Sequence, residues 1–302
     1  MAFPTSCNIE IAEDTHIRDV ADRRRVWFAQ LLGALAWLSG QYDDTEFVFR
    51  GHSEESWELA SSLWRFSGAT SEAELRKAER GILTDVKRDF WFTREFQFEP
   101  EGDNWRTLAV LQHHGIPTRL MDGTSDPLVG LYFAVTGIAK VDAHDKVDGA
   151  LYMIRRPSAG GSFLPYDVRS APQATPRVTA QRSLFLLPKR LPRTSSAAEF
   201  YLIKAAHRSP VAGEVSMDGV SIDCKGPSTV TGFSGLVGRF LAGTHVGRPS
   251  RYPPNIVRFI IPHLAKPICR ENLRALGVSA RNLYPGIDGY KRGLLIEGDR
   301  PF

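Results

Sequence analysis

The sequence predicts an α+β protein with a mixed or split β-sheet core and flanking helices. Short segments suited to strands lie between longer segments with helical periodicity, and no internal repeat is visible. The chain has 302 residues, of which 42% are hydrophobic, so it can bury one large core or two modest ones. We expect a helical lead-in over residues 1–40, weakly ordered in residues 1–15, followed by one domain over residues 41–302 with a loop-rich insertion at about 188–251.

Three elements are predicted in the first third of the chain. Apolar residues at helical spacing indicate a helix over residues 23–38, and a short strand is predicted over residues 45–49. A long amphipathic helix is predicted over residues 71–92, because Ser71 and Glu74 have the spacing of a capping box at its start.

The segment 108–135 contains two predicted helices around a polar loop. The first helix ends where Gly115 and Pro117 interrupt it, and the second begins at Asp126 and Pro127, which suit the N-cap and the first helical position. The polar residues between them are Gln112, His113, His114, Thr118, Arg119, Asp122, Thr124, Ser125 and Asp126. So many donors and acceptors would be costly to bury without partners, which indicates a binding or catalytic loop.

Further strands and one further helix are predicted in the rest of the chain. The strands are at 150–154, 177–187 and 256–261, and the helix is at 266–276, where Gly277 ends it. Segments 155–176 and 188–251 are rich in Pro, Gly and Ser and are predicted to be loops, apart from a helix at 197–206.

Composition and charge exclude few functions. The 38 basic and 34 acidic residues give a net charge of +4, which permits nucleotide or nucleic-acid binding without requiring it. Cys7, Cys224 and Cys269 lack the spacing of metal ligands, which favours reduced thiols. The chain has no long apolar run and no start typical of a signal peptide, so we expect a cytoplasmic protein that does not engage membranes.

Four motifs, in order, resemble the FRG-domain family. Phe49-Arg50-Gly51 opens FRGHSEESWELASSLWRF at 49–66, and LQHHGIPTRLMDGTSDPLVGLYFA is similar to the main motif of the family. RVTAQRSLFLL at 177–187 and IIPHLAKPICRENLRALGVSARNLYPGIDGY at 260–290 resemble its third and last blocks. Gly123 departs from the family pattern, in which an aromatic residue is usual, and the last block lacks the acidic residue that often precedes its isoleucine.

The order of these motifs is also similar to that of ADP-ribosyltransferases of the arginine, serine, glutamate class. The resemblance matches Arg50 to the arginine, Thr124 and Ser125 to the serine position, and Gln181 to the start of the third motif. It implies an ADP-ribosyltransferase-like fold in which the arginine grips a phosphate or ribose of NAD. The strand that bears the serine would line the nicotinamide pocket, and NAD would be a substrate.

The expected catalytic glutamate is missing. The resemblance places it two positions beyond Gln181, where this chain has Ser183. In that enzyme class the carboxylate stabilises the positive charge that develops in the transition state. Asp122 and Asp288 are candidate substitutes because each lies in a polar turn beside apolar structure. The alternatives are a helix or turn cap for Asp122 and an Asp-Gly turn residue for Asp288.

Arg50 is the first candidate ligand-binding residue. An arginine at a strand end followed by Gly51 places a permanent cation beside a backbone that a phosphate can approach closely, although a structural salt bridge is equally compatible. His52 could reach the same pocket or be a solvated loop residue. Arg119, after Thr118, could bind phosphate or neutralise Asp122 three positions further on.

His113 and His114 are candidate polar groups of the same pocket. Successive helix positions point about 100° apart, so both cannot easily ligate one metal, and no metal site is predicted. One histidine is expected to hydrogen-bond inside the fold and the other to face the pocket, with His113 the preferred candidate for the pocket.

The sequence therefore predicts a pocket between the Arg50 strand and the 112–126 loop. The leading hypothesis is an NAD-dependent ADP-ribosyltransferase or NAD glycohydrolase, and the resemblance implies an intracellular toxin or anti-phage effector with a protein or nucleic-acid acceptor. The alternative is a non-catalytic module of a defence system that binds a nucleotide or nucleic acid. A protein-interaction domain would leave the polar pocket unexplained.

Overall fold

The fold was analysed in a computed structural model of the chain. It describes residues 6–11, 19–40, 47–57, 59–69, 71–90, 105–137, 145–156, 166–170, 176–188, 216–217, 220–224 and 256–296. The predicted helix at 197–206 lies outside these residues. Over the described part of the chain the protein is mixed helix and sheet, which confirms the α+β fold class.

The described strands form one sheet in the order β5-β6-β3-β2-β4-β9-β1-β8-β7. They are β1 (Ser6–Ile11), β2 (Phe47–His52), β3 (Met121–Thr124), β4 (Gly149–Arg155), β5 (Tyr166–Ser170), β6 (Ser183–Pro188), β7 (Ser216–Met217), β8 (Val220–Cys224) and β9 (Ile256–Ile261). β1 and β9 are parallel, and the other neighbours are antiparallel. β2 and β3 pair only through Phe49 and Thr124, so the two strands diverge on either side of this point.

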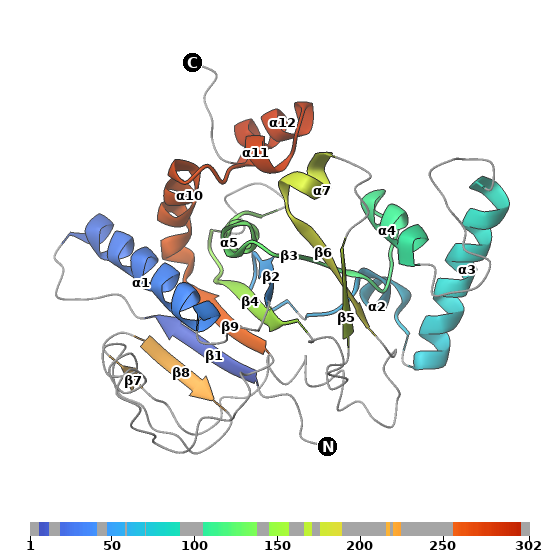
Figure 1. Ribbon diagram of the computed structural model, residues 1–302, viewed down its shortest axis with the longest axis horizontal. Coiled ribbons are helices and arrows are strands. Elements are labelled where there is room, and N and C mark those ends of the chain that lie inside the picture. Colours follow the sequence, from blue (N-terminus) through green and yellow to red (C-terminus); the bar gives the residue numbers. More distant parts are fainter. Residues whose placement is uncertain are drawn as a thin grey trace.

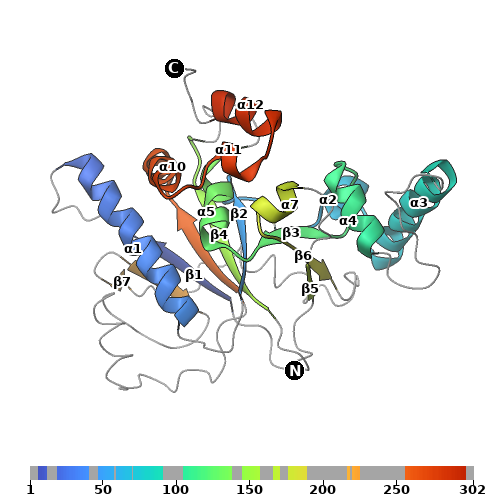
Figure 2. The same ribbon diagram turned by 45° about the horizontal axis from the view of Figure 1, so that its top comes forward.

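The described helices surround this sheet (Figure 1). They are α1 (Val20–Gly40), α2 (Ser62–Ser67), α3 (Glu72–Phe90), α4 (Trp105–His113), α5 (Pro127–Val135), α7 (Pro176–Ala180), α10 (Lys266–Ala275), α11 (Ala280–Leu283) and α12 (Ile287–Ile296), with a 3₁₀ turn at His263–Ala265. Figures 1 and 2 show α1 and α3 at opposite ends of the molecule, with α5 against the centre of the sheet. None of these described helices combines the length and apolar character that a membrane span needs.

The contact between α5 and the sheet depends on glycines. A Cβ atom at Gly51 of β2 would overlap the backbone of Gly130 and Ala134 in α5, and one at Gly149 of β4 would overlap the Ala134 carbonyl. Close approach lets Phe49 pack with the apolar residues of α5 in the largest buried cluster. Gly51 is therefore required for helix packing, whereas its sequence context suggested room for a phosphate.

Several predicted elements are confirmed because their signals are local. Asp126 caps α5 by accepting hydrogen bonds from the N–H groups of Leu128 and Val129, and Pro127 occupies the first turn. Ser71 accepts a hydrogen bond from the N–H of Glu74 at the start of α3. The helices predicted at 23–38 and 266–276 and the strands at 150–154 and 256–261 are also present, as α1, α10, β4 and β9.

Other predictions about the elements are wrong. Residues 6–11 form β1, paired with β8 and β9, and are not a weakly ordered lead-in. The predicted strand at 177–187 is divided into α7 and β6, because Arg182 has a positive φ of 45° that breaks an extended run. The predicted loops contain β5, β7 and β8.

Candidate functional site

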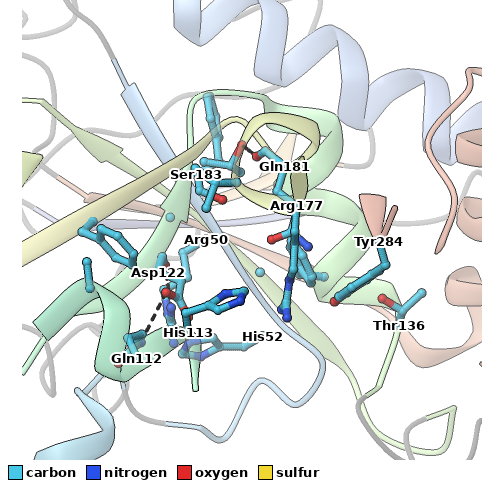
Figure 3. Close-up of a pocket in the computed structure, with 18 of the residues that line it drawn as sticks. Arg50, His52, Gln112, His113, Asp122, Thr136, Arg177, Gln181, Ser183 and Tyr284 are labelled. Atoms are coloured by element: carbon cyan, nitrogen blue, oxygen red, sulfur yellow. Dashed lines mark hydrogen bonds between the residues drawn. The ribbon is translucent and has the colours of Figure 1, made fainter. Parts of the chain in front are cut away.

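A pocket of about 560 Å³ lies where β2 and β3 diverge, bordered by α4, α7 and the end of α11 (Figure 3). Its described lining residues are Phe49, Arg50, Gly51, His52, Ser53, Trp57, Arg65, Ala109, Val110, Gln112, His113, His114, Asp122, Gly123, Thr124, Phe133, Thr136, Arg177, Val178, Gln181, Ser183, Phe185, Tyr284 and Arg292. This volume lies within the usual range for small-molecule sites, roughly 300–1,000 Å³.

Arg50 lies within β2, not at its end, and its side chain is held by two hydrogen bonds. Its Nε donates to Nε2 of His52 at 3.0 Å, and its Nη1 donates to the backbone carbonyl of Asp122. Burial lowers the pKa of Arg50, an effect that the nearby Asp122 opposes, yet a guanidinium stays protonated at neutral pH. The remaining three of its five N–H groups have no partner in the described part of the chain, so they are available to an anionic ligand.

His52 orients Arg50 and is not the solvated loop residue that the sequence also allowed. Its side chain is buried at the end of β2, and its ring meets the Tyr152 ring edge-on with 5.1 Å between centroids. Because Arg50 is a donor only, Nε2 of His52 must be the acceptor, and the neutral ring carries its proton on Nδ1.

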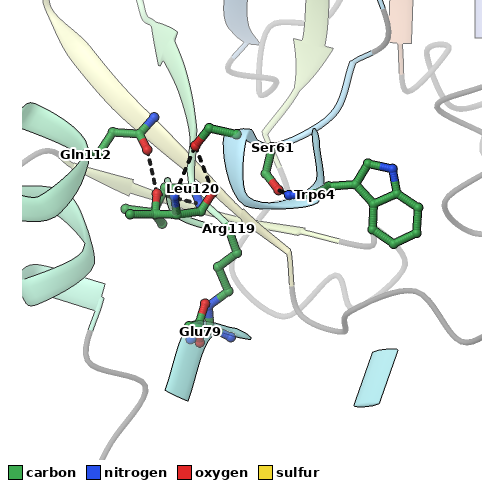
Figure 4. A network of polar contacts seen from close by, with 8 residues as sticks. Ser61, Trp64, Glu79, Gln112, Arg119 and Leu120 are labelled. Carbon is green, nitrogen blue, oxygen red and sulfur yellow. Dashed lines mark hydrogen bonds and ion pairs between the residues drawn. The ribbon is translucent and has the colours of Figure 1, made fainter. Parts of the chain in front are cut away.

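The loop between α4 and β3 is fixed by a network of hydrogen bonds around Thr118 (Figure 4). Ser62 accepts a hydrogen bond from the N–H of Thr118 and donates one to its carbonyl. The Thr118 hydroxyl donates to Oε1 of Gln112, whose Nε2 donates in turn to Oδ1 of Asp122 at 3.3 Å. Thr118 is buried outside the pocket lining, so its structural role is to hold Gln112 and, through it, Asp122 at the pocket.

Neither role that the sequence suggested for Arg119 is observed. Its Nε lies 3.1 Å from a carboxylate oxygen of Glu79 in α3, and both side chains are largely buried. The ion pair fastens the loop to α3 (Figure 4), and Arg119 is absent from the pocket lining.

The third motif contributes Gln181 and Ser183 to the pocket from the start of β6. Gln181 is buried, and its side-chain Nε2 donates a hydrogen bond to the Leu283 carbonyl at 3.1 Å. Its backbone carbonyl accepts a hydrogen bond from the Thr124 hydroxyl at 2.8 Å. Ser125 is exposed and does not line the pocket; its N–H donates to the carbonyl of Arg182. The resemblance matched both Thr124 and Ser125 to the serine position, and of these two residues only Thr124 lines the pocket.

The remaining candidates divide between the pocket and the surface. His113 and His114 both line the pocket, with ring centroids 5.4 Å apart, so the predicted division between an inner and an outer histidine is wrong. Asp288 is an exposed residue in the first turn of α12 and lies neither in the pocket nor in an Asp-Gly turn. Within the part of the chain that the structure describes, no group of three or more metal-ligating side chains converges.

Sequence reasoning missed Arg65, Arg177, Tyr284 and Arg292. Arg65, Arg177 and Tyr284 lie inside segments recognised as the first, third and last family blocks, but no spacing pattern linked them to Arg50. Arg65 comes from α2 and Arg292 from α12, and only the fold brings them to the same cavity.

The described pocket lining is strongly cationic. Arg50, Arg65, Arg177 and Arg292 line it together with Asp122, which is the only carboxylate among these residues. None of the four arginines forms an ion pair with any residue in the described part of the chain. Within the described residues, an α+β fold thus gathers guanidinium groups without ion-pair partners around one cavity, an arrangement suited to an anionic ligand.

Comparison with protein families agrees with the motifs. Residues 45–143 match the FRG domain, so the chain contains an FRG domain and the predicted resemblance is confirmed over this segment. The matched segment includes Arg50, Gln112, Asp122 and Thr124, whereas Gln181 and Tyr284 lie beyond it. No curated protein and no solved structure matches the chain.

Proposed function

We propose that the pocket binds NAD and that the protein is an ADP-ribosyltransferase or NAD glycohydrolase. The observation that carries the proposal is a set of four arginines around one cavity that form no ion pair within the described residues, together with one carboxylate in the same lining. Arg50 is best placed to grip a phosphate, because two hydrogen bonds fix its guanidinium and leave one edge of it free.

The arrangement of strands supports an ADP-ribosyltransferase-like reading of the fold. The three motifs lie on neighbouring strands, with Arg50 on β2, Thr124 on β3, and Ser183 on β6 next to Gln181. All four residues line the same pocket. These residues lie far apart in the sequence and line one cavity, which supports the proposal that this cavity holds NAD.

Asp122 is the residue we assign to the missing carboxylate. In hydrolysis the bond between ribose C1′ and the nicotinamide nitrogen breaks, and nicotinamide leaves with the bonding electrons. Water then attacks C1′ and loses a proton to solvent, while Asp122 stabilises the positive charge on the ribose. In transfer, a nucleophile of a protein or nucleic-acid acceptor replaces the water.

One observation favours a second candidate, a non-catalytic nucleotide-binding module. Ser183 lines the pocket at the position where the resemblance expects glutamate, and a hydroxyl cannot supply the same negative charge. Under this alternative the ligand binds through the arginines without being cleaved. A role as an intracellular toxin or anti-phage effector is compatible with either candidate and is proposed from the family resemblance.

Release of nicotinamide from NAD separates the two candidates. We expect the purified chain to release nicotinamide slowly with water alone and faster with an acceptor from cell extract. Asp122→Asn should abolish release while changing NAD affinity little, because a transition-state interaction affects turnover more than binding. Asp288→Asn is the matched control, since this exposed aspartate lies outside the pocket lining. NAD binding without release under either condition would favour the binding module.

A further inference from the structure

Tyr284 stands at the end of the pocket away from Asp122 and is held firmly in place. Its N–H donates to the Ala280 carbonyl at 2.9 Å, and a Cβ atom on Gly289 would overlap the Tyr284 carbonyl, so the turn into α12 is tight. The adjacent Leu283 carbonyl accepts a hydrogen bond from Gln181. Figure 3 shows Tyr284 with Arg177 and Thr136 on one side of the pocket and Gln112 on the other.

Two arginines share the ring of Tyr284. The guanidinium carbon of Arg177, from α7, lies 4.7 Å from the ring centroid, and that of Arg292, from α12, lies 4.2 Å away. Both distances are within the range of cation–π contacts, about 6 Å. One buried aromatic side chain therefore orients two cations from separate helices towards the same cavity.

Both of these arginines are positively charged at neutral pH. Neither Arg177 nor Arg292 forms an ion pair within the described residues. Burial raises the pKa of Tyr284, so its phenol is neutral and adds no negative charge. Two like charges beside one ring repel each other, and an anion bound between them offsets this repulsion because it attracts both. A phosphate suits this place, because guanidinium groups bind its oxygens through paired hydrogen bonds.

We propose that Arg177, Arg292 and Tyr284 form a second phosphate subsite, and that the pocket selects ligands with two phosphate groups over ligands with one. The inference rests on the proposed binding of a nucleotide phosphate at Arg50. It narrows the ligand class to nucleoside diphosphates and dinucleotides, in which one phosphate group would contact Arg50 and the other would contact Arg177 and Arg292. Nucleoside monophosphates satisfy only one of the two subsites.

Calorimetric titration of the full chain with ADP-ribose, AMP and inorganic pyrophosphate tests the subsite. We expect ADP-ribose to bind at least tenfold more tightly than AMP. Arg177→Ala and Arg292→Ala should each weaken ADP-ribose binding about tenfold, and the double variant should lose the preference over AMP. Arg281→Ala is the matched control, because Arg281 makes a similar contact with Tyr290, 5.3 Å from the ring centroid, outside the pocket lining.

The outcomes separate this inference from the proposed function. If Arg50→Ala removes binding but the double variant binds ADP-ribose as the unmodified chain does, the subsite is wrong and the proposal for Arg50 stands. If the double variant loses the preference and Arg50→Ala has no effect, the subsite stands and Arg50 is not the anchor. Equal affinity for AMP and ADP-ribose, or no binding of any of the three probes, overturns the subsite. Circular dichroism confirms that each variant is folded.

Discussion

The arginines of the pocket and five arginines elsewhere in the described chain have opposite surroundings. Outside the pocket, Arg88, Arg119, Arg182, Arg258 and Arg270 each form an ion pair with an aspartate or glutamate. Arg50, Arg65, Arg177 and Arg292 form none within the described residues. Among the described residues, Asp122 is the one carboxylate that shares the pocket lining with these four arginines, and it forms no ion pair with them. We propose that the first group stabilises the fold and that the second binds a ligand, and mutations in the two groups can test this proposal.

The largest effect on stability is expected from Arg119. Its partner Glu79 is only 12% exposed, so Arg119→Ala removes the guanidinium from beside a nearly buried carboxylate. Breaking such a pair costs about 3 kcal/mol of unfolding free energy, which urea denaturation measures. Replacing both residues with apolar ones, as in Arg119→Met with Glu79→Leu, should recover most of the loss. The division between the two groups of arginines is wrong if Arg119→Ala weakens ligand binding and leaves the free energy of unfolding unchanged.

Mutation of Arg50 should change ligand affinity more than stability. Arg50→Ala removes a charge-assisted contact worth roughly 1.5–3 kcal/mol, a loss of about tenfold to hundredfold in affinity for ADP-ribose. Arg50→Lys should restore only part of it, because an ammonium group cannot reproduce the fork of donors. Calorimetry measures both variants, and exposed Arg88→Ala is the control. Unchanged affinity in both Arg50 variants would exclude Arg50 as the anchor.

Mutation of His52 tests the role of Arg50 in ligand binding more specifically, because His52 acts by orienting Arg50. His52→Leu removes the acceptor of the Arg50 Nε–H bond and should weaken ADP-ribose binding by about 1 kcal/mol, roughly fivefold. His52→Gln places an amide oxygen at a similar reach and should restore affinity. Equal losses in the two variants would mean that His52 contributes through packing against Tyr152, with no specific hydrogen bond required.

Lys266 lies outside the pocket lining, and its surroundings differ from those of both groups of arginines. It is fully buried, its Nζ donates to the Ser53 carbonyl at 2.6 Å, and burial lowers its pKa from 10.5 to about 8. Between pH 8 and pH 10.5 Lys266 is protonated in the unfolded chain and largely deprotonated in the folded chain. The free energy of unfolding therefore rises with pH in this range. Below about pH 8 Lys266 is protonated in both states, so its titration does not change the free energy of unfolding. Relative to Lys266→Met, the unfolding free energy should rise by at most about 1.4 kcal/mol per pH unit above pH 8. Parallel pH profiles for the two proteins would contradict this.

The smallest effect is expected for the stability of Arg65→Ala. Arg65 is exposed at the pocket and lowers the pKa of Arg50 through like-charge repulsion. Its removal should leave thermal stability unchanged or raise it by up to about 0.5 kcal/mol, as expected for a surface site without a partner. A clear fall in melting temperature would show that Arg65 belongs with the arginines that serve the fold.

Sequence reasoning located much of the pocket because several of its residues lie in motifs. The sequence alone indicates six candidate residues that all line one cavity: Arg50, Gln112, His113, Asp122, Thr124 and Gln181. Their functional roles stay predictions. Ser125 and Asp288 were placed wrongly because a residue's position in a motif does not fix which way its side chain points, and a short turn or helix start decides that locally.

The sequence by itself determined the elements whose signals are local. Asp126 and Pro127 begin α5, Ser71 begins α3, and Gly277, with its positive φ of 81°, ends α10 through backbone conformation that neighbouring residues set. Only the tertiary structure decided that β1 joins the sheet, that Arg119 pairs with Glu79, and that Arg177 and Arg292 meet at Tyr284. These contacts join segments far apart in the chain, and their energies depend on burial and on distances that no local pattern encodes.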